Sequence, residues 1–342
     1  MTEPLDIQKT IAKVVDGDNL SPSEMVAAMQ KIMSGECGDA QIGGLLVALR
    51  IKGETVDEVA AAARVMRQLA SGVHCESTDL IDIVGTGGDS SSTFNISTTS
   101  ALVAAAAGLK VAKHGNRAVS SKSGAADLLE VAGVNIELDA AQVAKCVDEV
   151  GLGFMFAPRH HGAMRHAIGP RKELGMRTIF NVLGPLTNPA SAPRQIMGVY
   201  SKALVEPMAQ VLKKLGSVGA MVVHGEDGMD EISNGAVTHV AELKNGEVIT
   251  YDIDPQKFSI SRTEINEIRV TSAEESLAMV KQVLANTPGA ARDIVVLNAG
   301  AAIYVGGKAD THQQGIELAL QLLADGSAAK KLDQLIACSN NC

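Results

Sequence analysis

Hydrophobic residues in about the first seventy positions recur every three or four residues, a spacing that predicts helices and gives no sign of a strand. The segments Ser21–Glu24 and Thr55–Glu58 are both capping boxes, and the first has proline at the first helical position. The second box opens an alanine-rich helix that continues to about Leu69. We therefore expect a small helical unit. A surplus of apolar side chains on it is expected to pack against a larger domain or against a second subunit: Ile42, Leu45, Leu46 and Leu49.

From about residue 78 the pattern changes to short apolar runs that alternate with alanine-rich helical segments. The expected strands are residues 80–84, 110–112, 134–138 and 153–156, and the expected helices are residues 97–107, 125–132 and 140–150. Strands that alternate with helices in this way form a parallel sheet with right-handed crossovers. The predicted fold class is therefore α/β.

Further along the chain, helices are expected between residues 162 and 186, and strands at residues 195–200, 220–224 and 294–297. Asn245 and Gly246 separate two strand-like runs, 238–243 and 247–251, and so predict a hairpin. An amphipathic helix at 312–323 is expected to close the chain. We accordingly predict a helical domain from residues 1–74 with about 162–190, and an α/β domain with a mainly parallel central sheet from 75–161 and 191–342.

Composition narrows the classes of protein that fit this pattern. The chain has 342 residues and a formal charge of −9, and aromatic residues make up only 2% of it. Net negative charge and few stacking side chains argue against nucleic-acid binding. The five cysteines are scattered, odd in number and without C-x-x-C spacing, which favours reduced thiols in a cytosolic protein. With no signal-peptide pattern and no long uncharged apolar stretch, we expect a cytoplasmic protein that does not enter a membrane.

A glycine-rich turn, Gly85–Asp89, follows the first expected strand and leads toward a helix. Backbone N–H groups of such a turn face an anion, and the helix dipole adds positive potential. The turn lacks the third glycine of the dinucleotide fingerprint and the Gly-Lys-Ser/Thr of a Walker loop. Asp89 favours a sugar hydroxyl or a metal-bridged phosphate. The alternative, a tight turn in which Asn95 or Ser97 caps the helix, stays open on this motif alone.

A second loop, Lys113–Gly124, also follows a strand and precedes a helix. It carries three cations, three serines and two glycines, and no acid. In a chain of charge −9 this composition fits a di- or triphosphate, although a solvated basic loop would have it too. The carboxyl ends of neighbouring parallel strands share one edge of the sheet, where ligands of α/β proteins bind. The two loops together therefore favour an anion site.

Two further segments concentrate charge. The segment Pro158–Asn181 holds five Arg or Lys, three His and one acid on expected helices, and an arginine there suits a carboxylate ligand. The segment His224–Ser233 places four acids in a loop at the end of a strand, an oxygen-rich site for a hard cation such as Mg²⁺. Asp230 and Glu231 are the better pair because they lie at the far edge of the loop. The alternatives are solvated side chains in the first segment and an exposed acidic turn in the second.

These four motifs, in this order and spacing, resemble those of the anthranilate phosphoribosyltransferase family of tryptophan biosynthesis. The likeness runs from about residue 5 to the C-terminal helix and includes Gly169–Arg171 and Asn181–Pro189. It implies a small helical domain that also dimerises, a larger α/β domain and an active site at the hinge between them. The implied reaction transfers the phosphoribosyl group of phosphoribosyl pyrophosphate (PRPP) to the amine of anthranilate, giving N-(5-phosphoribosyl)anthranilate and pyrophosphate.

The resemblance also implies site residues. Those for PRPP are Gly85, Gly88, Asp89, Thr93, Asn95, Ile96, Ser97, Thr98, Lys113, His114, Gly115, Asn116, Arg117, Ala118, Val119, Ser120, Ser121 and Ala125, the last standing where many members have a serine. Those for anthranilate are Gly85, Asn116 and Arg171, with His114 and His161 lining its path. Mg²⁺, taken as two ions, would be held by Ser97, Asp230 and Glu231. No general base is implied, so catalysis is expected to be electrostatic and metal-assisted.

Two other functions remain as alternatives on sequence grounds. Pyrimidine-nucleoside phosphorylases share the architecture and a Gly-Thr-Gly-Gly turn, but Asp89 and the segment Lys113–Arg117 fit them less well. A nucleic-acid-binding relative of the same fold is disfavoured by the charge of −9 and by the acidic pair Asp230 and Glu231. The expected protein partners are a second copy of the chain and a separate anthranilate synthase, since the sequence shows no amidotransferase domain.

Overall fold

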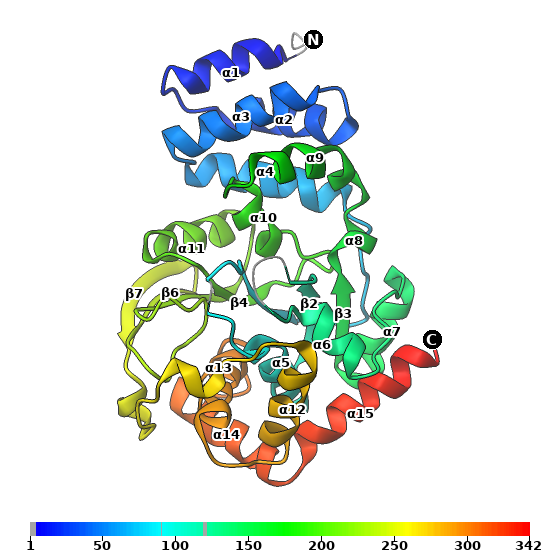
Figure 1. Cartoon of the computed structure of the whole chain (residues 1–342), viewed down its shortest axis with the longest axis vertical. Coiled ribbons are helices and arrows are strands. Elements are labelled where there is room, and N and C mark those ends of the chain that lie inside the picture. The colour runs from blue at the N-terminus through cyan, green and yellow to red at the C-terminus, as the bar shows by residue number, and fades with distance from the viewer. Residues whose placement is uncertain (1–4, 90, 119–121) are drawn as a thin grey trace.

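The structure is a computed structural model that describes residues 5–89, 91–118 and 122–342. A seven-stranded sheet lies at its centre, with a group of helices stacked beyond one side of it and a second group on the other (Figure 1). The strands are β1 Leu80–Gly85, β2 Lys110–Gly115, β3 Leu152–Phe156, β4 Arg194–Gly198, β5 Gly219–Gly225, β6 Thr238–Lys244 and β7 Glu247–Ile253.

The helical group at the N-terminal end is built from two separate parts of the chain (Figure 1). Its helices are α1 Ile7–Val15, α2 Pro22–Ser34, α3 Asp39–Lys52, α4 Val56–Leu69, α9 Arg165–Leu174 and α10 Phe180–Leu186. Helix α9 packs against α2 and α3, and α10 packs against α4. Both predicted capping boxes form, at Ser21 and at Thr55.

The apolar surplus of this group is buried within the chain. Ile42, Leu45, Leu46 and Leu49 are each 1% exposed, in a cluster that continues onto one face of the sheet through residues such as Met197. Helix α3 packs mainly against α1 and α9, so these side chains fill the helical group itself instead of facing the expected larger domain or second subunit.

The sheet has the order β3-β2-β1-β4-β5-β6-β7. The first five strands are parallel, and β6 and β7 add an antiparallel hairpin at one edge. Asn245 and Gly246 turn this hairpin with positive φ values of 52° and 78°, which asparagine and glycine tolerate best. The predicted fold class and hairpin are confirmed.

The remaining helices cover the sheet. They are α5 Ile96–Ala106, α6 Ala125–Val131, α7 Ala140–Val150, α8 Ala157–His160, α11 Val205–Lys214, α12 Ala273–Leu284, α13 Ala290–Val305, α14 His312–Ala324 and α15 Ser327–Asn340, with short 3₁₀ turns η1 Gly162–Met164, η2 Lys202–Leu204, η3 Pro255–Phe258 and η4 Ile265–Ile268. Alternate residues of one strand face opposite layers: Val222 packs with α11 and the helical group, whereas Met221 packs with α5 and α13.

Two predicted strands are wrong, and the helix predicted at 312–323 is present as α14 but is not the last one. Residues 134–138 form no strand, because their alternating apolar side chains are buried while Asn135 donates its N–H to Ser339 Oγ of α15 at 3.1 Å instead of joining the sheet. Residues 294–297 belong to α13, whose side chains there are all buried, so helical periodicity is not visible. The chain does not close at 312–323, since α15 follows α14.

Candidate active site

The five parallel strands end at one edge of the sheet, as their register shows: Gly85 pairs with Gly198, Gly115 with Phe156, and Gly198 with Val223. Three loops therefore start at the same edge of the sheet. They are the glycine-rich turn after β1, the second loop after β2 and the acidic loop after β5. From the end of β3 the chain runs directly through α8 and η1 into α9 of the helical group (Figure 1). The predicted motifs thus gather at this edge.

The acidic loop rests directly on the glycine-rich turn. Asp230 Oδ2 accepts a hydrogen bond from Gly87 N at 2.7 Å. A side-chain carbon at Gly85 would lie 2.3 Å from that same oxygen, and one at Gly198 would lie 1.6 Å from the Asp230 carbonyl oxygen. Glycine is needed at both positions because the acidic loop packs against bare backbone.

A buried asparagine on α13 holds the backbone next to the acidic pair in place. Asn298 is fully buried, its Oδ1 accepts from Ile232 N at 2.9 Å, and its Nδ2 donates to Ile232 O at 2.9 Å. Because Ile232 follows Asp230 and Glu231 directly, this two-way contact sets where both carboxylates point. The sequence does not signal Asn298, which directly follows the apolar run 294–297 that predicts a strand.

Three carboxylates act on one buried ammonium group, that of Lys113: Asp82, Glu231 and Asp230. Burial raises the pKa of Asp230 to about 7, and the nearby Asp89 carboxylate adds to the rise. Burial, and then Asp230, raise the pKa of Glu231 well above its usual value, whereas Lys113 and the backbone N–H of Ser97 oppose the rise. Burial lowers the pKa of Lys113, and Asp82, Glu231 and Asp230, in that order, oppose the fall. Burial and mutual repulsion therefore disfavour the ionised forms of both acids when no cation is bound.

Lys113 is placed beneath the acids by two contacts. Its Nζ donates to Ile83 O of β1 at 2.5 Å and to Ser97 Oγ of α5 at 3.3 Å. Ser97 lies in the first turn of α5, where unpaired N–H groups favour anions. Ser97, Lys113, Asp230 and Glu231, which the sequence predicted for one site, are thus brought together.

The segment after the glycine-rich turn is anchored to distant parts of the chain. Thr93 pairs with Arg269, and Asp89 Oδ1 accepts from Ser91 N at 3.1 Å. Asn95 Oδ1 accepts from Ser123 Oγ and from Ser276 Oγ of α12, both at 2.7 Å. The Asn95 side chain therefore ties the first loop to the second, and its predicted contact with PRPP stays a prediction.

The next two predicted PRPP residues lie in the first turn of α5. Ile96 is buried and its N–H donates to Phe94 O at 2.8 Å. Thr98 is 2% exposed, and its Oγ1 has no partner among the described residues. An unpaired hydroxyl at a helix N-terminus is available to a ligand, so of the two Thr98 is the better placed.

The second loop is held by an acid from α6. Asp127 Oδ2 accepts from Ala118 N at 2.8 Å and from Gly124 N at 2.9 Å. The exposed Arg117 forms ion pairs with Asp127 at 3.2 Å and with Glu130 at 2.7 Å. Arg117 is therefore engaged by α6, and a phosphate would have to compete for it.

The other predicted residues of this loop differ in exposure. Asn116 is exposed and its carbonyl accepts from Ala126 N at 3.2 Å. Gly115 faces Ala125, at the start of α6: a side-chain carbon on Gly115 would lie 3.2 Å from Ala125 Cβ. Val119, Ser120 and Ser121 lie outside the described residues.

Two buried histidines pack together behind the loops. The rings of His114 and His161 lie 5.1 Å apart, and the Nε2 atom of each has no partner among the described residues. The buried Asp82 fixes His114, because its Oδ1 accepts from His114 N at 3.1 Å and its Oδ2 accepts from Asn188 Nδ2 at 2.7 Å. Burial lowers the pKa of His114 to about 3 and that of His161 to about 4, so both imidazoles are neutral at pH 7.

This histidine pair should make the fold acid-sensitive. Below the unfolded-state pKa of about 6.5 the unfolded chain takes up protons that the folded chain does not, so stability falls as the pH falls toward 4. Each buried histidine contributes up to about 1.4 kcal/mol per pH unit in this range. His161→Gln should flatten the loss between pH 6 and pH 4, as measured by urea unfolding. The exposed His74, changed to Gln, is the control and should leave the slope as it is.

Two arginines approach from the helical group. Arg171 lies on α9 with its guanidinium 5.1 Å from the Phe180 ring, and no carboxylate of the described residues pairs with it. Arg177, which follows α9, donates from Nη2 to Gly88 O and stacks 4.0 Å from the Tyr200 ring. Arg177 thus joins the helical group to the glycine-rich turn. Its charge was noticed in the sequence, but nothing there signals this contact.

Comparison with known proteins identifies the family to which the chain belongs. Residues 77–329 match the family model described as glycosyl transferase family, a/b domain, and residues 8–70 match its helical bundle domain. An anthranilate phosphoribosyltransferase from Thioalkalivibrio sulfidiphilus is 58% identical over 338 residues, covering 99% of this chain and 100% of the relative.

Solved structures of similar proteins agree with this family. The enzyme of that name from Thermus thermophilus superimposes with a TM-score of 0.92 at 41% identity, covering 98% of this chain and 100% of that one. The one from Saccharomyces cerevisiae, in complex with PRPP and Mg, gives a TM-score of 0.90 at 28% identity, with 98% of both chains covered. The chain belongs to the glycosyl transferase family and, within it, to the anthranilate phosphoribosyltransferases.

Proposed function

We propose that the carboxyl edge of the parallel strands binds PRPP with Mg²⁺ and passes its phosphoribosyl group to the amine of anthranilate. The observation that carries this proposal is the acidic loop seated on the glycine-rich turn, with Asp230 bonded to Gly87 N at 2.7 Å. A turn that presents backbone N–H groups suits phosphate, and carboxylates beside it suit a cation that the phosphate shares. An activated phosphorylated sugar needs both.

The acidic cluster fits Mg²⁺ by its chemistry. Asp230, Glu231 and Ser97 offer oxygen ligands, and a cation bound there would favour the ionised forms of the two acids, which burial disfavours. Bound there with pyrophosphate, the ion would neutralise the charge that develops on the leaving group. The number of ions, two by the sequence-based expectation, stays a prediction.

The residues of the chain itself would act by charge and position. As pyrophosphate leaves, positive charge develops on ribose C1 and negative charge develops on the leaving group. Asp230 and Glu231 would offset the negative charge through the cation that they hold, while Lys113 limits the repulsion between the two acids. Anthranilate's amine is already neutral at pH 7, so the enzyme needs to place it rather than to activate it. Arg177, by joining the helical group to Gly88, would help to exclude water that otherwise hydrolyses the activated sugar.

Arg171 is proposed to bind the carboxylate of anthranilate. It is a half-buried cation without an acidic partner among the described residues, on the segment that leads from β3 into the helical group. Arg171→Ala should raise the KM for anthranilate and change kcat little, the pattern expected when binding is lost equally in ground and transition states. Initial rates at saturating PRPP measure this. An unchanged KM would place the carboxylate elsewhere, and Lys172→Ala on the exposed side of the same turn is the control.

One experiment separates this reaction from phosphorolysis. Pyrophosphate release is measured with anthranilate and PRPP, and base release is measured with thymidine or uridine and inorganic phosphate. We expect turnover in the first mixture only, as the relatives' names favour. Phosphorolysis without anthranilate-dependent turnover would overturn the proposal.

We also propose the division into residues 1–74 with about 162–190, and 75–161 with 191–342, and a homodimer formed through the helical domain. Two of its apolar side chains point to solvent: Ile51 is 81% exposed and Val15 is 67% exposed. Sedimentation velocity should give the mass of two chains, and Ile51→Glu should shift it toward one. A monomer at all concentrations would refute the dimer.

Among the described residues there is no helix with the length and apolar character needed to span a bilayer. A cytoplasmic location and an anthranilate synthase partner stay predictions.

A further inference from the structure

Three of the five cysteines, far apart in sequence, converge at the C-terminal end of the chain. Cys146 lies on α7, Cys338 lies on α15, and Cys342 follows α15. The Cys146 and Cys338 sulfurs are 3.4 Å apart, those of Cys146 and Cys342 are 3.8 Å apart, and those of Cys338 and Cys342 are 3.9 Å apart. Sequence reasoning treated these thiols as scattered, because the fold alone brings α7 to α15.

The spacing of the three sulfurs suits a single ion. Zinc binds thiolate at about 2.3 Å with tetrahedral geometry, which places any two sulfurs about 3.8 Å apart. The three sulfur–sulfur distances, 3.4, 3.8 and 3.9 Å, all lie near that value. A disulfide would use two sulfurs and leave the third without a role, whereas a metal uses all three.

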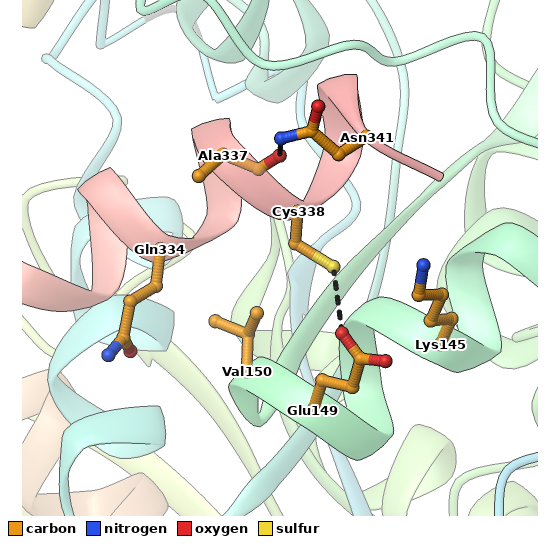
Figure 2. Close-up of a pocket in the computed structure, with 7 residues that line it drawn as sticks. All are labelled: Lys145, Glu149, Val150, Gln334, Ala337, Cys338 and Asn341. Atoms are coloured by element: carbon orange, nitrogen blue, oxygen red, sulfur yellow. Dashed lines mark hydrogen bonds between the residues drawn. The ribbon is translucent and has the colours of Figure 1, made fainter.

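The fourth ligand must come from outside the cluster, because among the described residues only the three sulfurs lie within 4.8 Å of one another. The exposed Glu149 side chain can reach the site by changing its rotamer. Glu149, one turn beyond Cys146 on α7, has its Oε2 3.9 Å from Cys338 Sγ, and Figure 2 shows the two side chains pointing toward each other. They line a pocket of about 410 Å³ together with Lys145, whose positive charge would partly offset a site of four anionic ligands. A carboxylate is an ordinary zinc ligand beside thiolates.

The cluster lies at a joint between two elements and away from the candidate active site. Helix α15 is held to α7 by Lys331, whose Nζ donates to Val150 O at 2.6 Å. Lys110, the first residue of β2, donates to Asp148 O of α7 at 2.6 Å. That end of α7 therefore sits at the amino edge of the sheet, opposite to the edge that carries the acidic pair.

We propose that Cys146, Cys338 and Cys342, with Glu149 as the fourth ligand, form a structural zinc site that fastens the C-terminal helix α15 to α7. The site has no open position for substrate and does not touch the reacting groups. Its effect is on the stability of the fold, because an ion bound only by the folded chain stabilises it.

The test is a zinc titration of the reduced full-length chain against a chromophoric chelator, with excess Mg²⁺ present to occupy the carboxylates of the active site. We expect one Zn²⁺ per chain. Cys342→Ser, at an exposed position that should not disturb folding, is expected to weaken binding by at least about tenfold, a loss that even indirect partners of a metal can cause. Cys75→Ser, a thiol outside the cluster, should bind as the parent does.

A second readout identifies the ligands. Cd²⁺ in place of Zn²⁺ should give thiolate-to-metal absorption in the ultraviolet for the parent and for Cys75→Ser, and a much weaker band for Cys342→Ser. Zinc should raise the Tm of the parent more than that of Cys342→Ser, while turnover at saturating substrates stays the same. Absence of thiolate absorption, equal zinc binding by Cys342→Ser, or failure of the reduced protein to bind zinc would each overturn the proposal.

Discussion

Replacing Asp230 by asparagine together with Glu231 by glutamine is expected to lower Mg²⁺-dependent turnover by about 100-fold or more. Both changes keep the size of the side chain and remove its charge. The amide oxygen introduced by Asp230→Asn can still accept from Gly87 N, so the loop should keep its place on the glycine-rich turn. What is lost is the negative charge that would hold the ion beside pyrophosphate.

Steady-state rates across a Mg²⁺ titration measure this effect. The double variant should also be at least as stable as the parent when no metal is present, because burial and mutual repulsion disfavour the ionised acids. Glu226→Gln, in the same loop but exposed, is the matched control and should keep its activity. Rates near those of the parent in the double variant would show that the metal is bound elsewhere.

Adding one methyl group at Gly85 should have an effect of similar size. The new carbon of Gly85→Ala would lie 2.3 Å from Asp230 Oδ2, closer than any contact allows, so the carboxylate must move away from Gly87 N. Gly85 does not have a positive φ, so backbone strain adds nothing to this displacement. A shift of about 1 Å in a catalytic group can cost about 100-fold in rate.

The measurement is kcat at saturating substrates, with the Tm recorded alongside it. Gly38→Ala is the control, since a side-chain carbon there meets nothing within 4 Å and the residue lies in the helical group. A Gly85→Ala enzyme that keeps the kcat of the parent would mean that the position of Asp230 does not matter.

Much of this site could be predicted because strand ends are visible in the sequence. Apolar runs such as Leu80–Gly85 stop at glycines, and in a parallel sheet those stops meet at one edge. The motif residues that follow these strand ends are therefore expected to lie near one another. The composition of the loops then indicated phosphate on one side and a cation on the other.

The positioning residues could not be predicted, because they act from elements that the sequence does not link to the site. Asn298 lies inside a helix buried on every side, where an apolar run looks the same as a strand. Asp82 lies inside a buried strand, and its partner Asn188 is 106 positions away. The same holds for the cysteine cluster, since Cys146 and Cys338 are separated by 192 positions.

The proposed reaction is tested by following the fluorescence of anthranilate in the presence of the purified protein. We expect the fluorescence to fall when PRPP and Mg²⁺ are both present, and to stay constant when PRPP is left out or when the metal is removed with a chelator. Loss of anthranilate that continues at the same rate without metal would contradict the role given to Asp230 and Glu231. No loss under any of these conditions would contradict the function itself.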